Sequence, residues 1–447
     1  MDLIGEWHAL LRPEEELTPR FTAAFASSMR AQKLTFGQRV HCPFLRPFFL
    51  SAADEARIRG AAETMALLGE RVIRAAFESD DIYDHLGMTE AEDALVDIEP
   101  GYLTASTTSR LDAFLLPDAL YFAEYNAESP AGIGYTQRLC ELFDATAAMG
   151  RFRATRQVRF HNVIDPLLGA LMASYHEWGG TATPPTMAIV DWRDVPTWTE
   201  FEILRDAFTA AGVPTIVCDP RELVLANGVL TAQGTKIDLV YRRVLVNDIL
   251  AKPLECRALV DACAARAVCM ANSFRCKLAH KKAFFAILTD PAYESLFSTS
   301  ERAVIQAHVP WTRVLDDVET RKGDWRGDLL ALARAWREHL VLKPNDEYGG
   351  KGVNLGWEMT EGEWDTALGS ALEDPYGTWI VQERIPVRRE MFPQFDATGR
   401  ITMADMLVDL APYLFRGRMG GYLTRLSATG LANVTSGGGQ VPAFVVE

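Results

Sequence analysis

The chain has 447 residues, of which 48% are hydrophobic and 23% are charged, and its formal net charge is −15. A chain of this length predicts two or three lobes, and the composition excludes a disordered protein or a coiled coil. The negative charge argues against a general nucleic-acid binder, because a phosphate backbone is bound by a basic surface.

The cysteines and the amino-terminal residues indicate a reducing, aqueous compartment. Seven cysteines are an odd number, and none belongs to a Cys-x-x-Cys pair. The four between Cys256 and Cys276 match no zinc-binding spacing, so we interpret them as apolar helix residues. Residues 1–17 lack a charged-then-apolar leader, and no window approaches about 18 uninterrupted apolar residues. We therefore expect a cytoplasmic protein without a membrane partner.

Residues 1–181 predict a helical N-terminal region that also contains one β-hairpin. Apolar residues at three- and four-residue spacing predict helices over Phe21–Ala31 and Ala52–Glu78, and Ser51 is a suitable N-cap for the second. The acidic run from Glu90 to Glu99 is interpreted as a solvated face. After the hairpin, Pro130 is expected in the first turn of a helix that ends near Met149. A further helix is expected over Ile164–Trp178.

A break of small residues and prolines at Ala182–Pro185 begins a second region, residues 182–271. A buried strand, an amphipathic helix and a second strand form a βαβ unit, over Met187–Val190, Thr199–Ala211 and Thr215–Cys218. Asn227-Gly228 predicts a hairpin, and Leu239–Val246 is expected as a third strand. No Gly-x-Gly-x-x-Gly follows the first strand, so a dinucleotide-binding domain is disfavoured.

The last region, residues 272–447, changes from helices to strands and glycines. Helices are expected over Leu254–Val268, at the end of the preceding region, and over Phe284–Leu288 and Arg302–Ala307. The expected strands are Val341–Lys343, Gly352–Trp357, Trp379–Gln382, Met403–Val408, Gly421–Leu426 and Pro442–Val446.

The most informative stretch is the hairpin from Arg110 to Asn126, which turns at Pro117-Asp118. If its loop holds an odd number of residues, Asp112 stands opposite Glu124, and Arg110 stands opposite Asn126, all on one face. Facing carboxylates repel unless a cation lies between them. Two carboxylates and an amide oxygen form the hard oxygen set that holds Mg²⁺ with substrate phosphates. The alternative is a solvent-facing hairpin whose charges are hydrated.

A second candidate is the glycine-rich segment from Val341 to Val353. An expected strand ends at Lys343-Pro344, and Gly349, Gly350 and Gly352 form a turn around Lys351. Glycines let backbone amides approach phosphate oxygens, and Lys351 adds a positive charge. The spacing is not that of a Walker A loop, and an ordinary glycine hairpin is the alternative.

Three further sets of residues are nucleotide-site candidates. Gln382 and Glu383 end a buried strand and could bind the adenine amine, although a solvated strand end is equally compatible. Lys281 and Lys282 open a helix, where one ammonium group could contact a phosphate. Arg425 precedes a loop with three consecutive glycines, residues 437–439, which could hold an oxyanion or be slack.

Together these stretches resemble the circularly permuted ATP-grasp family, in particular the synthetase half of glutathionylspermidine synthase. The family motif is Arg-x-Asp followed by Glu-x-Asn and a proline, here Arg110, Asp112, Glu124, Asn126 and Pro130. The resemblance implies that Asp112, Glu124 and Asn126 bind Mg²⁺ and that Arg110 binds the transferred phosphate. It also matches the helix lysine with Lys282, the strand lysine with Lys343 and a late arginine with Arg425.

The resemblance implies an α/β (α+β) fold with a circularly permuted ATP-grasp core, a small βαβ lobe like the pre-ATP-grasp lobe and a helical N-terminal region. It implies ATP and Mg²⁺ as cofactors and an ADP-forming ligase that joins a small-molecule or peptide carboxylate to an amine or thiol through an acyl phosphate. No cysteine amidase half is present, and Glu128-Ser-Pro replaces the usual Asp-Thr-Pro, so glutathione and spermidine are unsupported as substrates. An ATP-grasp phosphotransferase and a non-catalytic nucleotide-binding protein are the alternatives.

Overall fold

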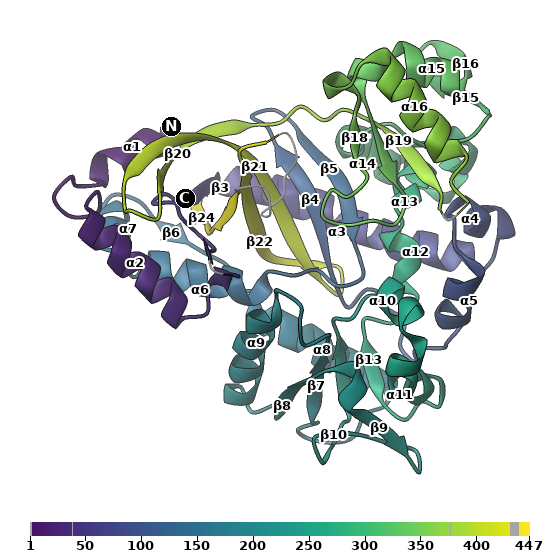
Figure 1. Ribbon diagram of the computed structural model, residues 1–447, viewed down its shortest axis with the longest axis horizontal. Coiled ribbons are helices and arrows are strands. Elements are labelled where there is room, and N and C mark those ends of the chain that lie inside the picture. The colour runs from purple at the N-terminus through teal and green to yellow at the C-terminus, as the bar shows by residue number, and fades with distance from the viewer. Residues whose placement is uncertain (1, 38, 376, 430–437) are drawn as a thin grey trace.

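A computed structural model describes residues 2–37, 39–375, 377–429 and 438–447. At its centre an antiparallel sheet has the order β23-β22-β21-β4-β5, and β20 also pairs with β21 (Figure 1). Its strands are β4 (Thr108–Leu115), β5 (Leu120–Asn126), β20 (Arg389–Phe395), β21 (Ile401–Phe415), β22 (Arg418–Ser427) and β23 (Gly439–Val441). The early hairpin and the late strands are therefore one sheet, in which Arg110 of β4 lies opposite Tyr413 of β21.

A long helix, α3 (Ala52–Ala76), packs against β21 and β22 of this sheet. Its apolar residues recur at helical spacing, and Ile58, Met65 and Val72 are fully buried. The Ser51 side chain accepts a hydrogen bond from the backbone N–H of Asp54, which confirms the predicted N-cap. The expected helix over Phe21–Ala31 is also present, as α2 (Pro19–Ala31).

A second antiparallel sheet, of four strands, stands beside the first at the upper right of Figure 1. Its order is β14-β19-β17-β18, with β14 (Thr312–Val314), β17 (Leu340–Pro344), β18 (Asn354–Leu355) and β19 (Trp379–Glu383). The strand expected over Gly352–Trp357 is shorter because residues 356–358 turn into a 3₁₀ helix. Two helices that we did not expect, α15 (Leu329–Ala335) and α16 (Glu361–Leu372), pack around the buried Trp364.

A four-stranded parallel sheet forms the lower part of the molecule in Figure 1, with the order β13-β12-β7-β8. The predicted βαβ unit is confirmed as β7 (Met187–Val190), α9 (Trp198–Ala210) and β8 (Thr215–Cys218). The predicted third strand is too long, because β12 (Leu239–Arg242) is followed by α10 (Val246–Ala251). The expected helix over Leu254–Val268 is present as α11 (Pro253–Ala264) but ends earlier than predicted, and β13 (Cys269–Ala271) follows it.

The predicted helix from Pro130 to Met149 is wrong at its start and in its middle. The first helix, α6 (Ile133–Asp144), begins after Gly132, whose φ of 100° is left-handed. The preceding residues cannot join it, because the carbonyls of Pro130 and Ala131 accept hydrogen bonds from Arg243 and Arg110. A separate helix, α7 (Ala147–Arg153), is capped by the Thr146 side chain. The helix expected over Ile164–Trp178 has those bounds in the structure.

The largest buried apolar cluster contains residues from all three predicted regions, and the boundaries at 181 and 271 stay a prediction. Part of this cluster is a small sheet of β3 (Phe48–Ser51), β24 (Ala443–Val446) and β6 (Val158–Arg159). None of the described helices has both the length and the apolar composition that a membrane span requires.

Candidate active site

The β4–β5 hairpin has the predicted pairing, with Asp112 opposite Glu124 and Arg110 opposite Asn126. The register shifts immediately after Asp112, so Ala123 has no direct cross-strand partner. A bulge of this kind leaves backbone groups outside the ladder. The Ala113 N–H donates to the carboxylate of Asp409 (3.1 Å), and the Ala123 carbonyl accepts from Nζ of Lys343 (3.3 Å). Through the bulge the hairpin therefore contacts Asp409 of β21 and Lys343 of β17.

Two guanidinium groups offset the carboxylate charge on this face. Asp112 Oδ1 accepts from Nε of Arg110 (2.9 Å) and from Nδ2 of Asn126 (3.1 Å), and its Oδ2 accepts from Arg425. Burial opposes ionisation of Asp112, but the two arginines outweigh it and hold its pKa well below the usual range. Glu124 accepts from Asn126 (3.2 Å). The face is a balanced cluster of charges rather than a hydrated surface.

Two lysines lie opposite this face, one from the second sheet and one from the start of helix α13 (Ala283–Thr289). Lys343 lies in β17 and donates through Nζ to Oε1 of Gln382 (2.7 Å). Burial lowers the pKa of Lys343 to about 8, with Glu124 opposing this shift. Nζ of Lys282 lies 3.7 Å from the Glu124 carboxylate and donates to the Glu347 carbonyl (2.5 Å). The hairpin carboxylates and the lysines therefore face one another across a single cleft.

A cavity of about 250 Å³ occupies this cleft. Its lining combines the charged residues Asp112, Glu124, Lys282 and Lys343 with the apolar residues Val341, Leu355, Trp357, Ile385 and Val387. Gly349 and Gly350 also line it. A second cavity of about 290 Å³ adjoins it and shares Glu124, Gly349 and Arg425 as lining residues. Arg110 and Asn126 line the second cavity, so the predicted residues extend over both.

Not every predicted nucleotide residue points into the cleft. Lys351 is exposed and pairs with Glu347 (2.8 Å), so the structure does not bring it to the other candidates. Gln382 lines the cavity, but its side-chain amide accepts a hydrogen bond from Lys343 and donates one to Thr312 Oγ1. Gln382 therefore positions the lysine. Glu383 lines the cavity and pairs with Lys322 (2.8 Å). Of the three glycines at 437–439, Gly437 lies outside the described residues, and so do residues 430–436.

The structure separates the roles of the two neighbouring lysines. Lys281 points away from the cleft and donates to Glu92 (2.8 Å) and Asp346 (2.9 Å). Glu92 is only 2% exposed, so the interpretation of the acidic run from Glu90 to Glu99 as a solvated face is wrong at this residue. The Glu92 carboxylate also forms the capping box with Thr89 at the start of α5 (Glu90–Val96). Lys281 holds α5 against the start of the glycine-rich segment.

Two important carboxylates were given no role in the sequence analysis. Asp409 is fully buried beside Asp112, accepts from Nε of Arg425 (2.5 Å), and burial raises its pKa to about 6. Glu128 is 1% exposed and accepts from Arg242 (2.9 Å). Although burial opposes it, Lys277 and Arg242 lower the pKa of Glu128 to about 2. For Asp409 a lone acid in an apolar run was the available signal, whereas the neighbours of Glu128 in the sequence give no such signal.

The residues of the hairpin fit a magnesium ion that is shared with a phosphate ligand. Within the described ranges no group of three or more His, Cys, Asp or Glu side chains is arranged to hold a metal ion by itself. Mg²⁺ is usually bound by one or two carboxylates, and phosphate oxygens and water complete its octahedron. Asp112 and Glu124 supply such a pair of carboxylates on one face, and the Asn126 amide donates to both through Nδ2.

Comparison with known proteins defines the class of fold. No family model matches the chain. It is similar over its whole length to the apo structure of a glutathione synthetase-like effector, GSS30, from Globodera pallida, with a TM-score of 0.61 and 12% identity, covering 97% of this chain and 98% of that one. A putative gamma-glutamylcysteine synthetase from Methylobacillus flagellatus has a TM-score of 0.41 at 10% identity, covering 86% of this chain and 85% of that one. The likeness to GSS30 shows that the chain has a mixed α/β, glutathione synthetase-like fold.

The sequence of the chain is also similar to those of particular bacterial proteins. Uncharacterized proteins of Mycobacterium tuberculosis and Mycobacterium bovis are 24% identical over 368 residues, which is 72% of this chain and 57% of each relative. The chain thus spans less than two thirds of the length of these relatives. The finer resemblance to glutathionylspermidine synthase, with a circularly permuted core, stays a prediction.

Proposed function

We propose that this protein is an ATP-grasp enzyme that uses ATP and Mg²⁺ to activate a carboxylate as an acyl phosphate and joins it to an amine or a thiol. The observation that supports this most directly is the cleft itself. Asp112 and Glu124 face Lys282 and Lys343, which come from a segment more than 150 residues later in the chain. Acidic groups for a metal and basic groups for phosphates are what binding of a metal–triphosphate complex requires.

The lining of the cavity of about 250 Å³ suits the parts of a nucleotide. Val341, Leu355 and Val387 offer apolar contacts for a purine ring. The two lysines would offset phosphate charge. Bound there by Asp112, Glu124 and Asn126, magnesium would supply charge neutralisation of the phosphates and orientation for in-line transfer.

The arginines are placed to act on the transferred group. Arg425 bonds to both Asp112 and Asp409, so it can give up the first partner and still be held by the second. Arg110 is held at its other end by the Ala131 carbonyl (3.1 Å). Both guanidinium groups border the adjoining cavity of about 290 Å³, where an acceptor carboxylate would be attracted to them. The geometry favours phosphoryl transfer to a carboxylate at the junction of the cavities.

Hydroxylamine trapping tests this function. The protein is incubated with Mg·ATP, hydroxylamine and a panel of carboxylic acids and short peptides, and ADP and hydroxamate are measured together. A ligase releases ADP and forms a hydroxamate with its own acid, because hydroxylamine captures the acyl phosphate. A phosphotransferase instead leaves a stable phosphorylated product, and a non-catalytic protein binds the nucleotide without releasing ADP. Asp112→Asn is the matched control, and ADP release at the same rate in this variant would contradict the proposal.

A further inference from the structure

A largely buried histidine, His280, lies on the acceptor side of the site. It ends α12 (Cys276–His280), two residues before Lys282. Together with Arg110 and Arg425 it lines the cavity of about 290 Å³, which we call the acceptor cavity. Only 14% of its side chain is exposed. Its Nδ1 is buried and has no hydrogen-bond partner among the described residues. Nε2 is therefore the ring nitrogen that remains for a ligand in the acceptor cavity.

A carboxylate is held beside this ring. Nε2 of His280 lies 4.0 Å from Oε2 of Glu128. The other carboxylate oxygen, Oε1, accepts from Arg242 (2.9 Å) and from the N–H of Val246, so Glu128 cannot turn away. Lys277 holds Oε2 from another side, with Nζ 3.5 Å away. A fixed carboxylate next to an imidazole stabilises the imidazolium that forms when the ring takes up a proton.

The imidazole of His280 is prepared to accept a proton at neutral pH. Burial and the Lys277 ammonium group lower the pKa of His280 below its ordinary value, so the ring is neutral at pH 7. Lys282 acts in the same direction, whereas Glu128 and Asp346 oppose the shift. Because no described group bonds Nδ1, no hydrogen bond fixes the tautomer, and Nε2 can carry the lone pair. A neutral ring with an available lone pair is what a general base requires.

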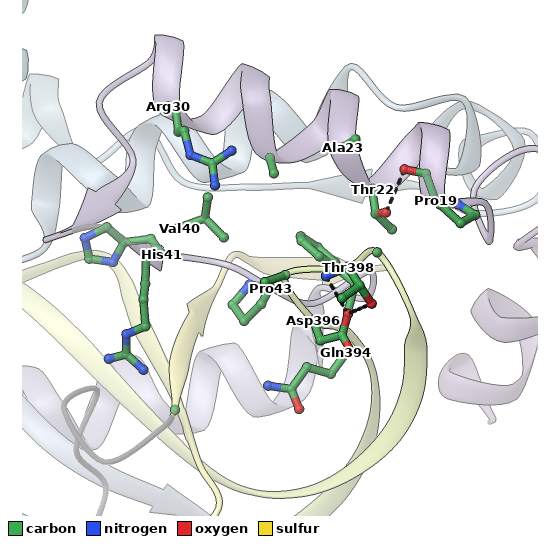
Figure 2. Close-up of a pocket in the computed structure, with 16 residues that line it drawn as sticks. Pro19, Thr22, Ala23, Arg30, Val40, His41, Pro43, Gln394, Asp396 and Thr398 are labelled. Atoms are coloured by element: carbon green, nitrogen blue, oxygen red, sulfur yellow. Dashed lines mark hydrogen bonds between the residues drawn. The ribbon is translucent and has the colours of Figure 1, made fainter.

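A second histidine of the acceptor cavity, His41, is less suited to this role. It lies on the segment from Arg39 to Pro43, which also borders a cavity of about 470 Å³ beside α2 (Figure 2). Its ring packs on Tyr135, with the ring centroids 4.1 Å apart. Burial lowers the pKa of His41 to about 4, so a proton on its ring is strongly disfavoured at pH 7. His41 is therefore the matched control for His280.

We propose that His280 is a catalytic residue, the general base whose Nε2 takes a proton from the ammonium group of the incoming amine. The inference rests on the proposed function for the acyl phosphate. An amine is mainly protonated at pH 7, and an ammonium nitrogen has no lone pair with which to attack. Once deprotonated, the nitrogen forms a bond to the acyl carbon, and the C–O bond to the phosphate breaks. A second nitrogen proton leaves with the phosphate, the third stays on the amide, and His280 returns its proton to water.

The test compares two small nucleophiles of similar size. Hydroxylamine is largely unprotonated at pH 7 and requires no base, whereas methylamine is almost fully protonated. The full chain is incubated with Mg·ATP, an acid that yields a hydroxamate and one of the two nucleophiles, and hydroxamate and N-methylamide are measured by mass spectrometry. His280→Gln should slow methylamide formation about 100-fold or more, while hydroxamate formation stays within about twofold of the wild-type rate. His41→Gln should leave the ratio of the two rates unchanged.

The pH dependence separates the loss of a base from a structural effect. In His280→Gln only free methylamine can react, so the methylamide rate relative to the hydroxamate rate should rise about tenfold per pH unit between pH 7 and 9. In the wild type this ratio should change much less, because His280 is neutral throughout that interval.

Three results would overturn the inference while leaving the proposed function intact. These are equal slowing of both reactions in His280→Gln, no slowing of methylamide formation, and absence of methylamide in the wild type although hydroxamate forms. Absence of hydroxamate with every acid would contradict the proposed function, and the inference with it.

Discussion

The titration of Lys343 should determine how nucleotide affinity depends on pH. Burial lowers the pKa of this ammonium group to about 8, and the charged groups that face it are Glu124, Asp112 and Lys282. Only the protonated lysine offsets phosphate charge. With a pKa of about 8, roughly 90% of the lysine is protonated at pH 7 and roughly 10% at pH 9. The dissociation constant for Mg·ATP should therefore rise about tenfold over that interval.

The assay is calorimetric titration of a non-hydrolysable ATP analogue with Mg²⁺ at pH 7, 8 and 9. Lys343→Arg keeps a positive charge at every pH and should bind with almost constant affinity, whereas Lys343→Met should bind weakly throughout. The same shift has a consequence for the free protein. Because the folded-state pKa lies below that of the unfolded chain, the unfolded chain binds more protons above pH 8, and stability should rise with pH there. A tenfold pH effect that persists in Lys343→Arg would refute the assignment.

Three other side chains give separate predictions. Asp112→Asn should reduce ADP formation by about 100-fold or more while the circular dichroism spectrum stays the same, and near-normal turnover would remove Asp112 from the metal site. Asp409 holds Arg425 only when ionised, so turnover should fall as the pH drops through about 6, and Asp409→Asn should be slow at every pH with unchanged affinity for Mg·ATP. A normal acid limb in that variant would contradict this role. Glu128→Gln should lower the free energy of unfolding in urea by about 3 kcal/mol, because it leaves buried Arg242 and Lys277 poorly compensated, and a loss below about 1 kcal/mol would argue against it.

The local features of the site were predictable because they depend on short-range rules. Alternation of side chains and the turn at Pro117-Asp118 predicted Asp112 opposite Glu124 only for a loop with an odd number of residues. The loop between Leu115 and Leu120 holds an even number, and the register shift after Asp112 is what places it opposite Glu124. The βαβ unit from Met187 to Cys218 was predictable because each element has its own pattern. Lys282 and Lys343 were assigned to a phosphate site from the resemblance to a family motif. The structure shows that they line the same cavity as the hairpin residues Asp112 and Glu124.

Other features depend on partners that no local pattern contains. Glu92 looks like one acid of a solvated run, but Lys281, 189 residues away, pairs with it in the interior. Pro130 follows the rule for a first helical turn, yet Arg243 holds its carbonyl and the helix starts later. Lys351 stands among glycines like a phosphate ligand, while Glu347 four residues earlier draws it outward. For Glu92 and Pro130 a contact distant in sequence decided the outcome, whereas for Lys351 a neighbouring acid did.

The pairing of β4 with β21 has a practical consequence for protein engineering. Arg110 of β4 lies opposite Tyr413 of β21, and the connecting segment Ala182–Pro185 lies between these two residues in the chain. Two polypeptides produced separately from either side of that connection would each hold an incomplete set of reactive groups. Reassembly along the β4–β21 edge and the pairing of β24 with β3 and β6 would complete the set. Fusing the halves to two interacting proteins would then give a split reporter whose signal is release of ADP.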